Sequence, residues 1–237
     1  MNVQQLDNQE IDAKVARFIA DAIKSSEHMN LGLATGSTYI QFYKELVSII
    51  LQEEIPIGSI KTFNLDKYFN QNPNTNSSFE SFMDRHLFKP LAFQDDQTFF
   101  PEYESSADYG SYDQLINAQG GIDILLLGIG VNAHIAFNEP GTPFSSKTHK
   151  IELAPSTIES NKEFFDDHEI IPKEAVTMGI STILNAKKII LMAKGENKAN
   201  AIHDMIHAPI SESVPATALR LHENVEVYVD KEAGSLI

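Results

Sequence analysis

An amide, an imidazole and a carboxylate lie within eight residues of one another, as Asn132, His134 and Glu139. They follow residues 122–126, a short apolar run that is typical of a buried parallel strand. Ligands of open α/β sheets bind beyond the carboxyl ends of the strands, so proton-handling groups at this point indicate general acid–base chemistry. An isolated histidine in a loop is about as often a plain surface residue, and it is the grouping of three side chains that predicts a site.

A second stretch has the pattern of a phosphate-binding turn. Residues 31–34 form a short apolar run, and a segment with apolar residues at helical spacing begins soon after it. The turn between them consists of Thr35, Gly36, Ser37 and Thr38. The free amides and the dipole of a helix N-terminus attract an anion, and hydroxyl groups add donors. A simple capped helix start is the alternative for such a turn taken alone.

Two further polar side chains follow predicted strands. Asp66 comes at the end of a predicted strand over residues 60–65. Lys198 lies in the turn between a predicted strand over residues 188–193 and the helix that follows. A carboxylate at a strand end often serves only as a local cap, so Asp66 indicates a site only in combination with its neighbours.

Residues 128–140 read G-I-G-V-N-A-H-I-A-F-N-E-P. This segment closely resembles the signature G-x-G-x-[DN]-G-H-I-[AG]-F-N-E-P of the glucosamine-6-phosphate deaminases (isomerases). The turn at 35–38 resembles that family's T-G-[GS]-[ST], residues 66–68 its D-E-Y, and residues 78–83 its S-[YF]-x-x-F-M. The resemblance runs from residue 31 to about residue 230, and the signature is far more specific than a lone G-x-G-x-x-G.

The resemblance implies an enzyme that converts glucosamine 6-phosphate to fructose 6-phosphate and ammonia by acid–base catalysis, with no metal and no other cofactor. It implies that Asp66 is the base at C2 and that His134 handles ring opening. It also implies that Glu139 tunes the charge of the imidazole, while Asn132 orients the ring. The residues expected to bind the phosphate are Thr35, Gly36, Ser37, Thr38 and Lys198.

Other activities remain open at this point. The corresponding reaction of galactosamine 6-phosphate differs at one hydroxyl group. The 6-phosphogluconolactonases share the family's fold, although F-N-E-P and the surroundings of Asp66 favour a deaminase. A non-catalytic sugar-phosphate sensor is a further alternative, but a sensor would not need Asp66, His134 and Glu139 together, and such regulators usually add a helix-turn-helix arm.

The sequence departs from the family pattern at several positions. Ala133 stands where the family has Gly, which costs on the order of 1 kcal/mol if the position requires a positive φ. Glu163 stands where N-[SA]-R-F-F has its phosphate-binding Arg, which predicts weaker phosphate binding, a compensating cation or a different natural substrate. The basic pair that serves allosteric activation in some hexameric members is replaced by His149 and Ile151, so we expect no activation of that type.

Apolar runs typical of strands alternate with segments of helical periodicity along the whole chain. We expect strands at residues 31–34, 60–65, 122–126, 188–193 and 225–229. We expect helices at residues 8–23, 38–50, 78–83, 109–118, 155–165, 172–184 and 215–220. This alternation predicts one domain, residues 1–237, of the α/β class: a three-layer α/β/α sandwich with a mostly parallel, Rossmann-like sheet.

The chain has 237 residues and a net charge of −15, from 33 acidic and 18 basic side chains. This field repels nucleic acid and anionic membranes, so we expect neither as a partner. It also repels an anionic substrate, so a small-molecule amino-sugar phosphate would need a locally positive pocket. We expect a monomer or a small homo-oligomer.

Cysteine is absent, which excludes disulfide bonds and a thiol nucleophile. His203 and His207 are four residues apart but lack the H-E-x-x-H pattern, so we expect an exposed helix face and no metal site. The N-terminus lacks the basic and apolar regions of a signal peptide, and no run approaches the ~20 apolar residues of a membrane span. A cytoplasmic protein is therefore expected.

Overall fold

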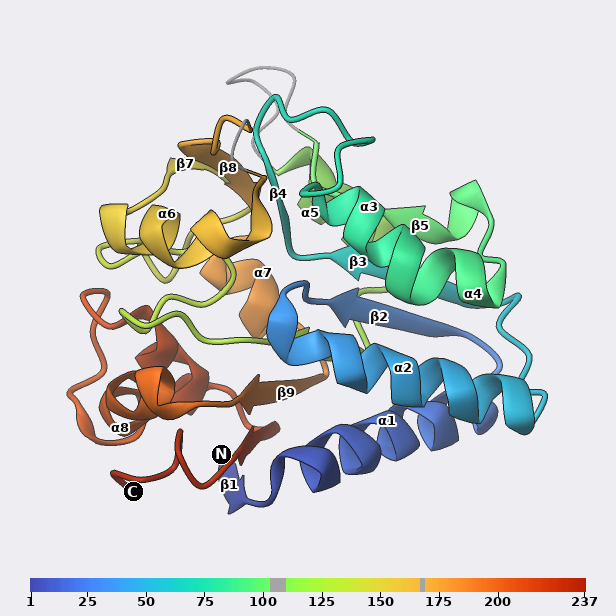
Figure 1. Ribbon diagram of the computed structural model, residues 1–237, viewed down its shortest axis with the longest axis horizontal. Helices are drawn as coiled ribbons and strands as arrows, with labels where there is room; N and C mark the ends of the chain where they lie inside the picture. Colours follow the sequence, from blue (N-terminus) through green and yellow to red (C-terminus); the bar gives the residue numbers. More distant parts are fainter. Residues whose placement is uncertain (103–109, 167–168) are drawn as a thin grey trace.

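The computed structural model describes residues 1–102, 110–166 and 169–237, apart from the side chain of Glu163. Its centre is a seven-stranded sheet in the order β1-β10-β9-β6-β2-β3-β5, in which every pair of neighbours is parallel (Figure 1). The strands are β1 (Asn2–Gln5), β2 (Met29–Leu33), β3 (Ile60–Asn64), β5 (Thr98–Phe99), β6 (Ile124–Leu127), β9 (Lys188–Ala193) and β10 (Val225–Val229). The apolar runs in the sequence therefore formed the predicted parallel strands, while β1 and β5 were not predicted.

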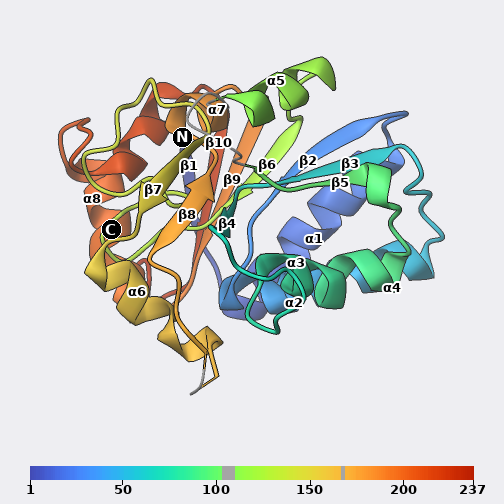
Figure 2. The ribbon, with the colours of Figure 1, turned by 90° about the horizontal axis from the view of Figure 1, so that it is seen from above.

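Helices cover both faces of this sheet. Figure 2 shows α1 (Asn8–Lys24) and α2 (Ser37–Gln52) on one side, and α5 (Ser111–Ala118) and α7 (Ile180–Leu184) on the other. The strand β6 between these layers is buried at all four of its residues, as a strand with helices on both faces must be. The predicted three-layer α/β/α sandwich is confirmed.

The local signals of the first helix explain where it begins. Glu10 Oε2 accepts the backbone N–H of Asp7 at 3.1 Å, which is a capping interaction at the start of α1. The buried face of the helix presents Ile11, Val15 and Ile19 to the core. Apolar residues at helical spacing thus fixed both the existence of α1 and its orientation.

Further helices surround the main layers. A π-helical turn, η1 (Asp84–Phe88), continues α3 (Phe79–Met83) and leads into α4 (Lys89–Leu91); this segment packs against α2. The others are α6 (Pro155–Asn161), α8 (Ala199–His207) and the 3-10 helices η2 (Asp95–Gln97), η4 (Lys162–Phe164), η5 (Glu196–Lys198) and η6 (Pro215–Leu221). None of the helices in the described part of the chain is long and apolar enough to cross a membrane.

A second, antiparallel sheet of three strands lies at one end of the molecule, beside α6 (Figure 1). It consists of β4 (Asp66–Tyr68), β8 (Glu174–Thr177) and β7 (His149–Glu152). The prediction of a helix over 172–184 was therefore wrong for its first half, because residues 174–177 are held by strand pairing on both sides. Asp66 likewise begins β4, where the sequence had placed it at the end of the preceding strand.

Four adjacent strands of the main sheet end at the same edge. In spatial order these are β9, β6, β2 and β3. From β2 the chain continues to β3 on one side, and from β6 it continues to β9 on the other side. Such a reversal leaves a crevice beyond the carboxyl ends of the strands, where α/β proteins bind ligands. The segments that follow these four strands carry the residues that the sequence predicts for catalysis and phosphate binding.

Candidate active site

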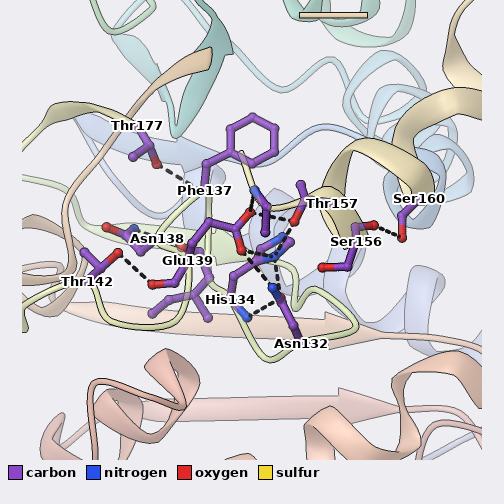
Figure 3. Close-up of polar contacts among 12 residues, drawn as sticks. Asn132, His134, Phe137, Asn138, Glu139, Thr142, Ser156, Thr157, Ser160 and Thr177 are labelled. Carbon is purple, nitrogen blue, oxygen red and sulfur yellow. Dashed lines mark hydrogen bonds and ion pairs between the residues drawn. The ribbon is translucent and has the colours of Figure 1, made fainter. Parts of the chain in front are cut away.

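A cavity of about 400 Å³ opens beyond the carboxyl ends of these strands. The predicted residues that line it are Thr35, Gly36, Ser37, Thr38, Asp66, His134 and Lys198. Asn132 and Glu139 are not part of the lining. Asn132 is hydrogen-bonded both to the imidazole of His134 and to Glu139 (Figure 3). The structure thus brings the predicted set together in two layers.

Hydrogen bonds fix the imidazole of His134 from one side. Its Nδ1 lies 2.7 Å from Asn132 Oδ1 and 3.6 Å from Glu139 Oε2. Asn132 Nδ2 donates to Glu139 Oε2 at 2.8 Å, and the Thr157 hydroxyl donates to Glu139 Oε1 at 2.6 Å (Figure 3). The backbone N–H of Ala154 also donates to Glu139 Oε1, at 3.1 Å. The carboxylate is therefore surrounded by donors.

These contacts determine which nitrogen of His134 carries a proton. Burial by itself raises the pKa of Glu139, but the adjacent imidazole of His134 in its protonated form, with the bonds from Thr157 and Asn132, outweighs burial and holds the pKa at about 2. An ionised carboxylate only accepts, so the Asn132 amide must turn its NH₂ group to Glu139 and its oxygen to His134. That oxygen in turn requires Nδ1–H. The other nitrogen, Nε2, has no hydrogen-bond partner among the described residues, and in the neutral ring it is the acceptor.

A tight turn presents this histidine to the cavity. Gly130 N–H donates to His134 O at 2.9 Å, and Ala133 N–H donates to Gly130 O at 3.0 Å. A Cβ on Gly130 would lie only 2.2 Å from the imidazole Cε1, so the ring packs directly on the glycine backbone. Ala133 has φ +63°, which is the left-handed region that favours Gly. Ala133 therefore destabilises the folded state by on the order of 1 kcal/mol relative to Gly at this position.

Asp66 faces the same cavity but in a different environment. It is only 9 % exposed, and burial raises its pKa from 3.8 to about 7. No hydrogen bond to its carboxyl group occurs among the described residues, so nothing offsets the loss of hydration. A carboxyl group with a pKa near neutrality can both take up and return a proton at physiological pH.

The turn after β2 forms another wall of the cavity. Gly36 has φ +101° and precedes the first residue of α2, so the backbone turns sharply into the helix. The amides of the first helical turn point out of its N-terminus, where the helix dipole also favours an anion. Lys198, in the short helix η5 that follows β9, also lines the cavity.

The charges around the cavity are the reverse of those of the whole chain. Among the described residues of the lining, the cationic side chains are Arg85, Lys194 and Lys198, and the one carboxyl group is that of Asp66. The chain as a whole carries 33 acidic against 18 basic side chains. A locally positive pocket in a negative protein is what an anionic substrate requires.

Several residues of this site were not predicted from the sequence. Thr157 holds Glu139, and its hydroxyl lies 3.4 Å from His134 Nδ1, but a single threonine in a helix gives no signal of such a role. Arg85 and His86 belong to η1, whose approach to the cavity depends on its packing against α2. Glu163, the predicted departure at the phosphate site, has a side chain outside the described part of the structure.

In the described ranges, no group of three or more His, Asp or Glu side chains could hold a metal ion. The rings of His203 and His207 lie 4.9 Å apart on α8, and His203 Nδ1 is 3.3 Å from Asp204 Oδ1. Both histidines are at least partly exposed, as expected for a helix face in contact with solvent.

A model of the family described as glucosamine-6-phosphate isomerases/6-phosphogluconolactonase matches residues 4–228. The chain belongs to this family. The glucosamine-6-phosphate deaminase of Bacillus pumilus (strain SAFR-032) is 42 % identical over 240 residues and is covered in full, as is this chain. That of Staphylococcus epidermidis (strain ATCC 12228 / FDA PCI 1200) is 40 % identical over 239 residues, which cover 99 % of this chain and 98 % of the relative.

Solved structures of family members show the same fold. A protein described as a monomeric glucosamine-6-phosphate deaminase superposes with a TM-score of 0.95 at 38 % identity, with full coverage of both chains. The 6-phosphogluconolactonase of Leishmania guyanensis superposes with a TM-score of 0.74 at 19 % identity, over 98 % of this chain and 97 % of its own. The second likeness shows the fold alone.

Proposed function

We propose that this protein converts glucosamine 6-phosphate and water to fructose 6-phosphate and ammonia. The observation that carries the proposal is the meeting of two proton carriers in one positively charged cavity. Asp66 is a buried carboxyl group with a pKa near 7, and the hydrogen bond between Asn132 Oδ1 and Nδ1 of His134 makes Nε2 the acceptor nitrogen of the neutral ring. The full-length relatives at about 40 % identity are glucosamine-6-phosphate deaminases, which supports this reaction over the lactonase activity of more distant family members.

The first step in the proposed mechanism opens the sugar ring. His134 Nε2 takes the proton of the O1 hydroxyl group and delivers it to the ring oxygen O5 as the C1–O5 bond breaks, which leaves an aldehyde at C1. The imidazolium formed in between is stabilised by the nearby Glu139 carboxylate. Asn132 cannot ionise, so its role is to hold the tautomer that makes Nε2 the acceptor.

Asp66 then carries out the isomerisation. Its carboxylate removes the proton from C2, and the C–H electrons form a C1=C2 double bond while the electrons of the C1=O double bond move to O1. O1 takes up a proton from solvent, which gives an enolamine. The same carboxyl group returns a proton to C1, which leaves an iminium group at C2. Water adds to C2 and ammonia leaves, so the water oxygen becomes the ketone oxygen of fructose 6-phosphate. The steps consist of proton transfers and one hydrolysis, so the reaction is both an isomerisation and a hydrolysis. Such steps call for no metal or redox cofactor.

The phosphate group belongs, in this proposal, at the turn after β2. The amides and hydroxyl groups of that turn and the ammonium group of Lys198 bind it. The residues of the turn are Thr35, Gly36, Ser37 and Thr38. This arrangement holds the sugar so that C2 lies towards Asp66 and O5 towards His134.

We further propose that residues 1–237 act as one domain. The protein works in the cytoplasm as a monomer or a small homo-oligomer on this small-molecule substrate, without nucleic acid or membrane partners.

Ammonia release from a panel of sugar phosphates tests the proposed reaction. The panel contains glucosamine 6-phosphate, galactosamine 6-phosphate and unphosphorylated glucosamine, and hydrolysis of 6-phosphogluconolactone is followed separately. We expect ammonia from glucosamine 6-phosphate and at least tenfold less from each other amine. Rapid hydrolysis of the lactone without ammonia release from any amine would refute the proposal.

Two variants separate the proposed roles of the proton carriers. Asp66→Asn should abolish exchange of the C2 hydrogen in deuterated water while leaving sugar-phosphate binding nearly intact; exchange within tenfold of the wild-type rate would refute its role as the base. His134→Gln should impair turnover of the closed-ring substrate more than the reverse reaction from open-chain fructose 6-phosphate. Equal losses in the two directions would contradict a role in ring opening.

A further inference from the structure

Arg85 provides the cavity with a guanidinium group that no other role accounts for. It lies in the π-helical turn η1, is exposed, and lines the cavity. Within the described residues, Arg85 Nη2 donates a long hydrogen bond to Asn76 O, at 3.5 Å. It forms no ion pair with any carboxylate in the described ranges. By contrast Lys194, another cation of the lining, is bound to the buried carboxylate of Asp12 at 2.6 Å.

The segment that carries Arg85 is fastened to the turn after β2. The ring of Phe82 packs against that of Tyr43, with 6.1 Å between their centroids. The hydroxyl group of Tyr43 donates to Ala34 O at 2.7 Å, and Ala34 directly precedes Thr35. These contacts hold α3, and η1 which continues it, beside the turn after β2, and Arg85 lines the same cavity as that turn.

The π-helical geometry of η1 has a consequence for the cavity. Arg85 and His86 are consecutive residues, yet both line it. Single π-helical turns are frequent at functional sites because the widened backbone redirects side chains. The ring of His86 lies 4.5 Å from that of Phe82, and burial, followed by the charge of Arg85, lowers its pKa. His86 therefore remains neutral near pH 7 and adds a hydrogen-bonding group beside the cation.

We propose that Arg85 is a substrate-binding residue that pairs with the phosphate group of the sugar phosphate held by the turn after β2. The proposal rests on the proposed function for the identity of the ligand. A guanidinium group binds a phosphate through two parallel hydrogen bonds, which a lysine cannot reproduce. Because this contact is made equally to the bound substrate and to the transition state, it affects the affinity and leaves the chemical steps unchanged.

The test compares Arg85→Gln with Lys89→Gln. Lys89 lies four residues further along the same helical segment, is exposed, and pairs with Asp84 outside the cavity lining. Titration calorimetry measures the binding of fructose 6-phosphate and of unphosphorylated fructose, and steady-state kinetics measure KM and kcat for glucosamine 6-phosphate. Arg85→Lys is a third variant, which keeps the positive charge but cannot form the two parallel hydrogen bonds.

We expect Arg85→Gln to raise the Kd for fructose 6-phosphate and the KM by about 10- to 100-fold, the effect of losing a hydrogen bond between charged groups. The kcat should change less than threefold, Lys89→Gln should match the wild type within twofold, and Arg85→Lys should fall between. A Kd for Arg85→Gln within threefold of the wild-type value would overturn the proposal. A wild-type protein that binds fructose 6-phosphate through Arg85 but releases no ammonia would refute the proposed reaction and leave this inference standing.

Discussion

Replacing Asp66 by Asn should abolish turnover and, at the same time, make the protein more stable at neutral and alkaline pH. The pKa of Asp66 in the folded protein is about 7, against an ordinary value of 3.8, because burial disfavours its ionised form. The folded state therefore binds a proton that the unfolded state has lost at every pH between these two values. Folding stability contributed by this group is fully present below pH 3.8 and is lost as the pH rises to about 7.

The magnitude follows from the difference of about three pKa units. One unit corresponds to 1.36 kcal/mol, so ionised Asp66 costs the folded state about 4 kcal/mol at pH 8. An Asn side chain has nearly the same shape and does not ionise. We compare the free energy of unfolding of Asp66→Asn with that of the wild type at each pH. We expect this difference to be larger at pH 8 than at pH 4 by about 4 kcal/mol, in favour of the variant. For a chain of this size that is an increase in Tm of roughly 10 °C.

Urea unfolding of the two proteins at pH 4, 6 and 8, followed by circular dichroism, measures this difference. Every other titrating group is common to both proteins and cancels in the comparison. A stability difference that stays constant across the three pH values would show that Asp66 is not held near neutrality by burial. The assignment of Asp66 as a base with a pKa matched to neutral pH would then lose its physical basis.

Three further predictions follow from the geometry of the site, and a fourth follows from the family pattern at residue 163. The kcat/KM of the wild type should rise with pH around a midpoint near 7, because Asp66 must be ionised to take a proton; a flat profile between pH 5.5 and 8.5 would contradict this. Gly130→Ala should lower kcat/KM at least 100-fold with an unchanged circular dichroism spectrum, because its Cβ would displace the imidazole of His134. Thr157→Val should lower the free energy of unfolding by about 1–3 kcal/mol and reduce turnover, whereas Thr157→Ser should do neither, because only Val removes a donor to a buried carboxylate. Glu163→Arg should lower the KM for glucosamine 6-phosphate at least tenfold at matched ionic strength, by adding an Arg–phosphate contact; an unchanged KM below about 1 mM would show that the phosphate is already well bound.

The parts of the fold that the sequence predicts are those with a strong local pattern. Strand β6 is a continuous apolar run, and α1 combines an acidic cap with apolar residues at helical spacing, so each could be recognised without knowing its neighbours. Strand β8 could not, because Ala175, Val176 and Thr177 form a short apolar run that helix and strand accommodate equally. Its pairing with β4 and β7 decides the matter, and those partners are far away in the sequence.

The same division applies to the site. Asp66 and His134 were recognisable because each follows a predicted strand within a long, specific motif. Thr157 and Arg85 were not, because their roles depend on where α6 and η1 pack, and neither helix has a local pattern that fixes its distance from the cavity. The tautomer of His134 has no signal in the sequence either, since it depends on the direction in which the Asn132 amide faces.

The order of the strands also decides when this site can come into existence during synthesis of the chain. The cavity needs the ends of β2 and β3, which the ribosome makes early, and the ends of β6 and β9, which it makes late. A nascent chain that stops before Ala193 has the base and the phosphate-binding turn but not the strand that completes the edge. Contacts between such distant segments form slowly, because a long loop must close before any of them is gained. We therefore expect a polypeptide that ends before β9 to be inactive towards the proposed substrate.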